Sequence, residues 1–83
     1  MEKFELIIHG NIPKNFSKLD LTEVSCIKLG YLKEELPEDF FPIKNNLKFL
    51  YIYTSSITKL PKSIENLSAL TVLEIIKCRR MEN

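Results

Sequence analysis

Cysteine, histidine and glycine are scarce in this chain, and their scarcity excludes several kinds of site. The 83 residues include two cysteines, one histidine and two glycines. Two cysteines are too few for a disulfide scaffold, and no C-x-x-C pattern indicates a zinc site. Two glycines do not make the glycine-rich loop that cradles phosphate. We therefore expect no catalytic residues, no metal site and no cofactor, and we do not expect an enzyme.

A dominant charge and long apolar runs are also missing. Lys and Arg number 12 and Asp and Glu number 11, which gives a net charge of +1. Nucleic-acid binding normally leaves a clustered basic footprint, so we expect no nucleic-acid partner. The first apolar run, Leu6–Ile8, is too short for a signal peptide or a membrane span. We expect no membrane association and a cytoplasmic location. Hydrophobic residues still make up 45% of the chain, enough for the core of one small domain.

An internal repeat is the strongest positive signal. Pro13, Pro37 and Pro61 recur at equal intervals, each directly after an apolar residue. An apolar trio also recurs at a constant interval, which is one residue shorter than the interval between the prolines. The trios are Met1, Phe4, Leu6; Val24, Ile27, Leu29; Leu47, Leu50, Ile52; and Leu70, Leu73, Ile75. The alternation within each trio predicts half-buried strands near residues 4–8, 27–31, 50–54 and 73–77. The prolines end the strands, and apolar residues at three-residue intervals then favour short 3₁₀ or helical returns.

These motifs resemble the leucine-rich repeat, L-x-x-L-x-L-x-x-N/C-x-L. The continuation L-P-x-x-I-x-x-L resembles the subclass seen in plant immune receptors and many bacterial and animal intracellular repeat proteins, and residues 47–67 match it best. The resemblance implies one domain with repeats at about 1–23, 24–46 and 47–69 and a partial repeat at 70–83. The implied fold class is α/β: a short solenoid with about four parallel strands on its concave face and irregular, 3₁₀ or short helical returns on its convex face.

The expected core follows from the repeat. Strand side chains that point inward should stack between repeats, because a single repeat cannot bury its apolar face alone. The predicted core residues of the strands are Phe4, Leu6, Ile27, Leu29, Leu50, Ile52, Leu73 and Ile75. The returns should close the core with Ile12, Phe16, Leu36, Phe40, Leu60, Ile64 and Leu67. The family's inward asparagine, which bonds neighbouring turns, is replaced by His9, Leu32 and Ser55, and by Cys78 in the last repeat.

The residues between the core positions should face outward on the concave side. They are Lys3, Glu5, Ile7; Cys26, Lys28, Gly30; Phe49, Tyr51, Tyr53; and Val72, Glu74, Ile76. Three aromatic residues on one strand beside two aliphatic ones predict an exposed apolar patch, which is typical of a binding site. The candidate partner-binding residues are Cys26, Lys28, Phe49, Tyr51, Tyr53, Val72, Glu74 and Ile76. Aromatic and β-branched residues also favour strands without any ligand, so both interpretations stay open.

Other polar groups are expected to be structural. His9 and Cys78 should lie three strands apart, roughly 14 Å, and Cys26 and Cys78 about 10 Å apart, too far for a catalytic pair or a disulfide. The acidic stretch at 34–39 should be a solvated edge of the convex side. Lys77, Arg79 and Arg80 are either solvated or contact an acidic partner.

Three functional hypotheses follow. The first is a protein–protein interaction module that binds another protein through the concave face. The second is a small stand-alone inhibitor that occludes a larger enzyme or receptor. The third is a fragment or self-assembling subunit of a larger leucine-rich-repeat protein, because the terminal strands would have exposed edges open to self-association.

Overall fold

The chain forms a single parallel sheet of four strands. The computed structural model describes residues 4–14 and 21–76. The strands are β1 (Phe4–His9), β2 (Val24–Gly30), β3 (Phe49–Tyr53) and β4 (Val72–Ile76), paired in the order β1-β2-β3-β4. A five-residue 3₁₀ helix, η2 (Lys62–Asn66), lies between β3 and β4. The four predicted parallel strands are confirmed, and no helix in the described ranges is long and apolar enough to cross a membrane.

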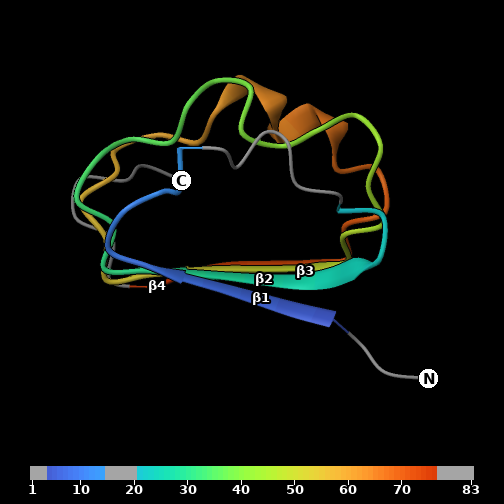
Figure 1. Cartoon of the computed structure of the whole chain (residues 1–83), viewed down its shortest axis with the longest axis horizontal. Coiled ribbons are helices and arrows are strands. Elements are labelled where there is room, and N and C mark those ends of the chain that lie inside the picture. Colours follow the sequence, from blue (N-terminus) through green and yellow to red (C-terminus); the bar gives the residue numbers. More distant parts are fainter. Residues whose placement is uncertain (1–3, 15–20, 77–83) are drawn as a thin grey trace.

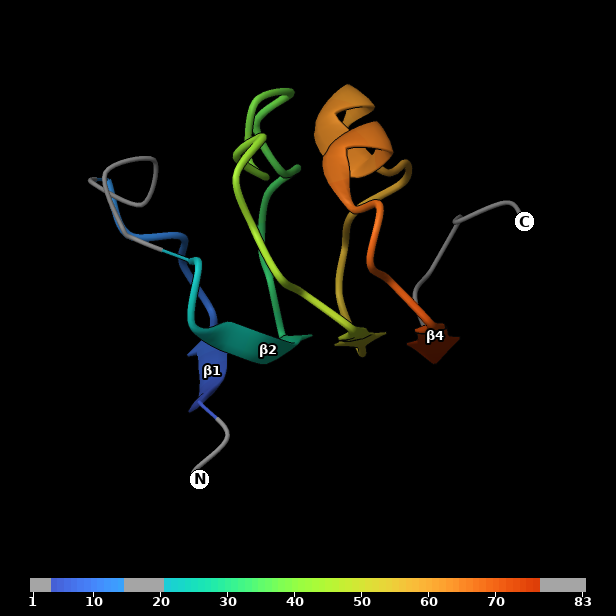
Figure 2. The same ribbon diagram turned by 90° about the vertical axis from the view of Figure 1, so that its right-hand side faces the viewer.

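The returns after β2 and β3, and the described parts of the return after β1, lie on the same side of the sheet. Figure 2 shows the strands in a row, with the returns above them in the same order. In Figure 1 the returns arch over one face of the sheet and leave the other face uncovered. We call this uncovered side the outer face. The arrangement is compatible with a short repeat-type solenoid, in which every turn packs on the one before it.

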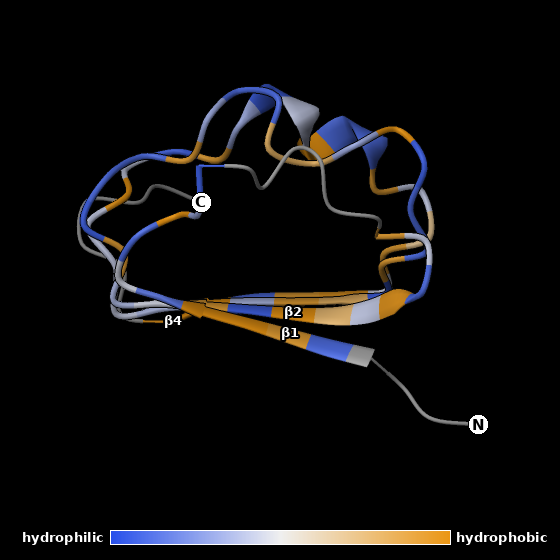
Figure 3. Cartoon of the chain, in the orientation of Figure 1, coloured by the Kyte–Doolittle hydropathy of each residue, from blue (hydrophilic) through white to orange (hydrophobic). Residues whose placement is uncertain are grey.

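The core lies between the sheet and the returns. Ile27, Leu29, Leu50 and Ile52 have no exposed surface, as predicted. Three of the predicted return residues are also buried: Leu36, Phe40 and Leu67. Ile12, Leu60 and Ile64 are partly buried against this core, and the side chains of Phe4 and Phe16 lie outside the described residues. In Figure 3 hydrophobic residues lie along the strands, whereas much of the return segments is hydrophilic.

The register of β1 differs from the prediction. The spacing of the apolar trios pairs Phe4 with Ile27, but the structure pairs Leu6 with Ile27 and Ile8 with Leu29. The predicted spacing holds from β2 to β3 and from β3 to β4. Because strand side chains alternate with a period of two, a two-residue slip keeps Leu6 on the inner face and Glu5 and Ile7 on the outer face, as predicted. The slip buries Ile8, which is 7% exposed and absent from the predicted core.

The last strand is less buried than predicted. Leu73 pairs with Leu50 and was expected in the core, yet it is 41% exposed. The next inward residue of the same strand, Ile75, is only partly buried. β4 is the terminal strand of the sheet, so no described repeat packs against its far side. The same inward position is therefore fully covered in β2 and β3 and only partly covered in β4.

Side chains of the returns connect successive turns. The Ser55 hydroxyl accepts a hydrogen bond from the Leu32 amide at 3.1 Å and donates to the Tyr53 carbonyl at 3.0 Å. Ser55 therefore performs the role of the missing asparagine with a shorter side chain. The Ser63 hydroxyl accepts from the Phe41 amide at 2.9 Å. These bonds satisfy backbone groups inside the turns, which would be costly to bury alone.

Two acidic residues of the return after β2 also bond the next turn, and their side chains are exposed, as expected for a solvated edge. The Glu35 carboxylate accepts the Thr58 amide at 2.9 Å and the Thr58 hydroxyl at 2.7 Å. The Glu38 carboxylate accepts the Lys62 amide at 2.6 Å, at the first residue of η2. These hydrogen bonds lower the pKa of both carboxyl groups below the ordinary value, chiefly through Thr58 for Glu35 and through the Lys62 amide for Glu38.

Candidate functional site

The outer face is organised as three rows of side chains that run across the four strands. Neighbours in a row are set by strand register, so each row takes one residue from each strand. The rows are Glu5, Cys26, Phe49, Val72; then Ile7, Lys28, Tyr51, Glu74; and then His9, Gly30, Tyr53, Ile76. All eight predicted binding residues lie in these rows. That they bind a partner stays a prediction.

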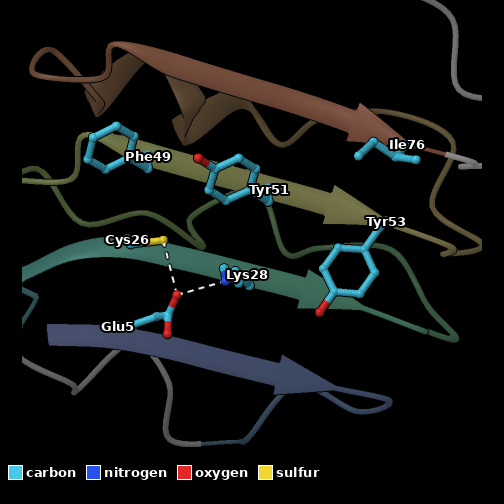
Figure 4. Close-up of a pocket in the computed structure, with 7 residues that line it drawn as sticks. All are labelled: Glu5, Cys26, Lys28, Phe49, Tyr51, Tyr53 and Ile76. Carbon is cyan, nitrogen blue, oxygen red and sulfur yellow. Dashed lines mark hydrogen bonds and ion pairs between the residues drawn. The ribbon is translucent and has the colours of Figure 1, made fainter.

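A shallow hollow of about 690 Å³ lies at the centre of the outer face. Figure 4 shows its seven lining residues: Glu5, Cys26, Lys28, Phe49, Tyr51, Tyr53 and Ile76. Six of these are among the predicted binding residues, and Glu5 was expected to face outward. Val72 and Glu74 lie outside the lining, beside Phe49 and Tyr51 respectively. The aromatic strand β3 therefore forms the middle of the hollow.

One side of the hollow is polar. Lys28 Nζ lies 2.9 Å from Glu5 Oε2, and the Cys26 thiol donates to the same oxygen at 3.8 Å. The hydrogen bond with Glu5, followed by the negative charge of Glu5, raises the pKa of Lys28 above its ordinary value. Lys28 Nζ also lies 6.0 Å from the centroid of the Tyr51 ring, within reach of a cation–π contact. Exposed pairs of this kind contribute little to stability, so we interpret this group as a surface feature.

Tyr53, at one end of the hollow, belongs to an aromatic cluster that the sequence did not predict. His9 Nε2 and the Tyr53 hydroxyl are 2.8 Å apart, and the rings of His9, Tyr31 and Tyr53 meet edge to face at 5.3–6.0 Å. His9 was expected to face inward as a substitute for asparagine, but it is exposed in the same row as Tyr53. The two-residue slip of β1 explains the difference. It aligns His9 with Gly30 and Tyr53, which are outward positions, and not with Ser55, which is inward.

Gly30 makes this cluster possible. A Cβ atom at Gly30 would lie 2.5 Å from Tyr53 Cε2 and 3.1 Å from His9 Cδ2. Any other residue would therefore push on the Tyr53 ring, which lies across the end of β2 in Figure 4. Tyr31 follows with a positive φ of 56°, as Thr54 follows β3 with 46°. This left-handed turn brings the Tyr31 ring, 54% exposed, back beside His9.

The outer face combines aromatic, aliphatic and a few charged side chains. Within residues 4–14 and 21–76, no three His, Cys, Asp or Glu side chains gather to hold a metal ion. Exposed aliphatic residues frame the aromatic strand, with Ile7 52% and Ile76 46% exposed. Such a surface can bury the apolar side chains of another molecule. Lys3, Lys77, Cys78, Arg79 and Arg80, which entered the predictions, lie outside the described residues.

Comparison with known proteins gives one informative relative. The chain is 37% identical over 67 residues to the disease resistance protein RPP2A of Arabidopsis thaliana. The match covers 80% of this chain, and the chain spans about 5% of the length of that relative. No family model matches the sequence, and no solved structure matches it. Plant immune receptors are among the proteins that the sequence motifs resemble, so the match supports a leucine-rich-repeat relationship.

Proposed function

We propose that this chain is a leucine-rich-repeat solenoid whose outer face, the concave side of the repeat, binds a protein partner in the cytoplasm. The observation that carries the proposal is the aromatic strand β3, whose three partly buried outward rings line the hollow between Lys28 and Ile76. Aromatic side chains are favoured anchors of protein interfaces because they bury a large area with few rotatable bonds. Occlusion of an enzyme or receptor is the narrower form of this proposal, and its readout is a fall in the target's activity when the chain is added.

The arrangement of polar and apolar groups supports this proposal. Phe49, Tyr51 and Tyr53 are each only partly buried, although they alternate with the fully buried Leu50 and Ile52. The inward residues therefore form the core, and each outward ring keeps part of its surface for contact with a partner. Truncating an outward ring removes less buried surface than truncating Leu50 or Ile52, so we expect it to affect binding more than stability.

The test is the double variant Phe49→Ala/Tyr51→Ala. Proteins captured by the wild-type chain from the cells that express it should be lost from this variant, because both rings line the hollow. The affinity for a purified captured protein should fall about a hundredfold or more, since the loss of two interface anchors should cost about 3 kcal/mol or more in total. Circular dichroism and urea unfolding should show a folded variant.

The matched control is Ile43→Ala, which removes an exposed apolar side chain from a return segment. Ile43 is 82% exposed and lies outside the three rows. It should keep full binding. If the folded double variant captures the same proteins as the wild type, the proposed function is wrong.

A second candidate function, self-association, is favoured by a specific observation. On β4, Leu73 is 41% and Ile76 46% exposed, so both faces of the terminal strand present aliphatic surface. The terminal strand of a sheet that carries apolar side chains is a template for adding another strand. A second copy of this chain that stacked on β4 would cover Leu73 in the way that β3 covers its equivalents in β2.

This candidate predicts a mass that rises with protein concentration in light scattering. Leu73→Lys should return the chain to a monomer, because a buried lysine without a partner is unfavourable at an interface. Ile43→Lys adds the same charge on a return segment and should leave the association unchanged. A wild-type monomer at every concentration rules this candidate out.

A further inference from the structure

The charges on the outer face specify the chemistry of the partner. Resting on the proposed binding function, we propose that the partner presents a basic side chain, lysine or arginine, to Glu74 and Tyr51, with bulky apolar side chains on both sides of it. The inference comes from the middle row, Ile7, Lys28, Tyr51 and Glu74, in which a tyrosine ring separates a cation from a carboxylate.

Among the described residues of this face, Glu74 is the carboxylate without an ion-pair partner. Three side chains of the rows belong to the charged types Glu and Lys: Glu5, Lys28 and Glu74. Glu5 and Lys28 form an ion pair at 2.9 Å, so their charges offset each other. Glu74 is exposed, and neither of the two ion pairs found among the described residues involves it. A partner carboxylate would meet like charge at Glu74, whereas a basic group would be attracted to it.

Tyr51 adds a second reason for a cation at this place. On its β2 side the ring already has a cation, Lys28 Nζ, at 6.0 Å from the centroid. On its β4 side the neighbour is Glu74. A guanidinium or ammonium group placed there would contact an aromatic ring and a carboxylate at once, which are the two groups that recognise such cations best.

The neighbouring rows define what surrounds the basic group. Phe49 pairs with Val72 on one side, and Tyr53 pairs with Ile76 on the other. Residues two apart on one face of a strand are roughly 7 Å apart, so two apolar positions flank the Tyr51–Glu74 pair at that distance. Because the Tyr53 ring leans over Gly30, the apolar surface on its side is mainly Ile76, which is 46% exposed. The complementary segment is therefore apolar, basic, apolar.

The experiment is a selection of short random peptides, displayed on phage, in parallel on four purified proteins. These are the wild type, Glu74→Lys, Phe49→Ala/Tyr51→Ala, and the control Glu34→Lys. Glu34 is an exposed carboxylate of the return after β2, outside the rows. Wild-type and Glu34→Lys selections should enrich peptides with lysine or arginine between apolar residues. Glu74→Lys should enrich aspartate or glutamate at that position instead.

The affinities of the selected peptides then test whether Glu74 recognises their basic side chain. Glu74→Lys should weaken the wild-type peptides by about tenfold or more, and Glu74→Gln, which keeps the shape and removes the charge, should weaken them less. Both variants must show the circular dichroism spectrum of the wild type. If peptides require Phe49 and Tyr51 but show no basic preference and ignore Glu74→Gln and Glu74→Lys, this inference is wrong and the binding function stands. If no selected peptide requires Phe49 and Tyr51, both are wrong.

Discussion

At the scale of single residues, Gly30 matters for the space it leaves open. A methyl group there would lie 2.5 Å from one atom of the Tyr53 ring and 2.9 Å from another. The ring rests over Gly30 and reaches His9 Nε2 with its hydroxyl at 2.8 Å. The absence of a side chain in β2 thus sets the position of a side chain from β3, and that position closes one end of the hollow.

Gly30→Ala should therefore displace the Tyr53 ring and break its hydrogen bond to His9. We expect a loss of about 1 kcal/mol in the free energy of unfolding, measured in urea, from strain and the lost bond. The ring is the movable end of a side chain, so the backbone of β2 should persist.

A double-mutant cycle isolates this effect from the general influence of alanine in a strand. In a Tyr53→Ala background the added methyl group meets no ring, and Gly30→Ala should cost much less there. An identical cost in both backgrounds would show that the Tyr53 contact is not the cause.

The outward aromatic residues could be predicted from sequence, whereas the cluster around His9 could not. Phe49, Tyr51 and Tyr53 alternate with leucine and isoleucine, and alternation alone assigns them to one face. His9 required the register of β1 against β2. The sequence favoured the spacing of the other repeats because Met1, Phe4 and Leu6 are all apolar, but Leu6 and Ile8 satisfy the same pattern two residues later.

At the scale of elements, the returns are connected to one another by carboxylates as well as by apolar contacts. Glu35 bonds Thr58, and Glu38 bonds the first amide of η2, each about one repeat further along the sequence. A 3₁₀ helix leaves its first amides without internal partners, so a carboxylate from the preceding turn is a natural cap. Sequence reasoning predicted only a solvated edge, because the amides that these carboxylates bond belong to the next turn and come close only when the turns stack.

These carboxylates predict a dependence of stability on acidity. The folded-state pKa of Glu35 lies below the ordinary 4.5, so its contribution is complete above that value and is lost as the pH falls through the folded pKa. Glu35→Gln should lower stability near neutral pH, and its difference from the wild type should shrink as the pH falls below about 4.5. Urea midpoints measured across this range give the readout.

The neighbouring substitution Glu34→Gln is the control for this pH experiment. Glu34 is exposed and adjacent in sequence, so it tests the general effect of removing one negative charge from the return. Its urea midpoint should follow the wild type at each pH. A constant difference between Glu35→Gln and wild type across the whole range would exclude the proposed role of the carboxylate charge.

At the scale of the whole molecule, the repeat predicted the strand count, the parallel order and about half of the buried core. The constant spacing of the apolar trios is enough to place Ile27 beside Leu50 and Leu50 beside Leu73. It does not show how well each position is covered. Ile27 and Leu50 are fully buried and Leu73 is 41% exposed, although all three occupy the same position in their repeats. Burial depends on having a neighbour on each side, and periodicity treats every repeat as equivalent.

The unequal cover of β3 and β4 has a consequence for any ligand of the outer face. Three pairs of outward residues link β3, whose inward residues are fully buried, to β4, whose inward Leu73 is 41% exposed. The pairs are Phe49 and Val72, Tyr51 and Glu74, and Tyr53 and Ile76. A molecule that bound to both strands would hold β4, the more exposed strand, against β3. Whatever recognises this surface would also consolidate the protein that presents it, so complex formation and local ordering would be thermodynamically linked.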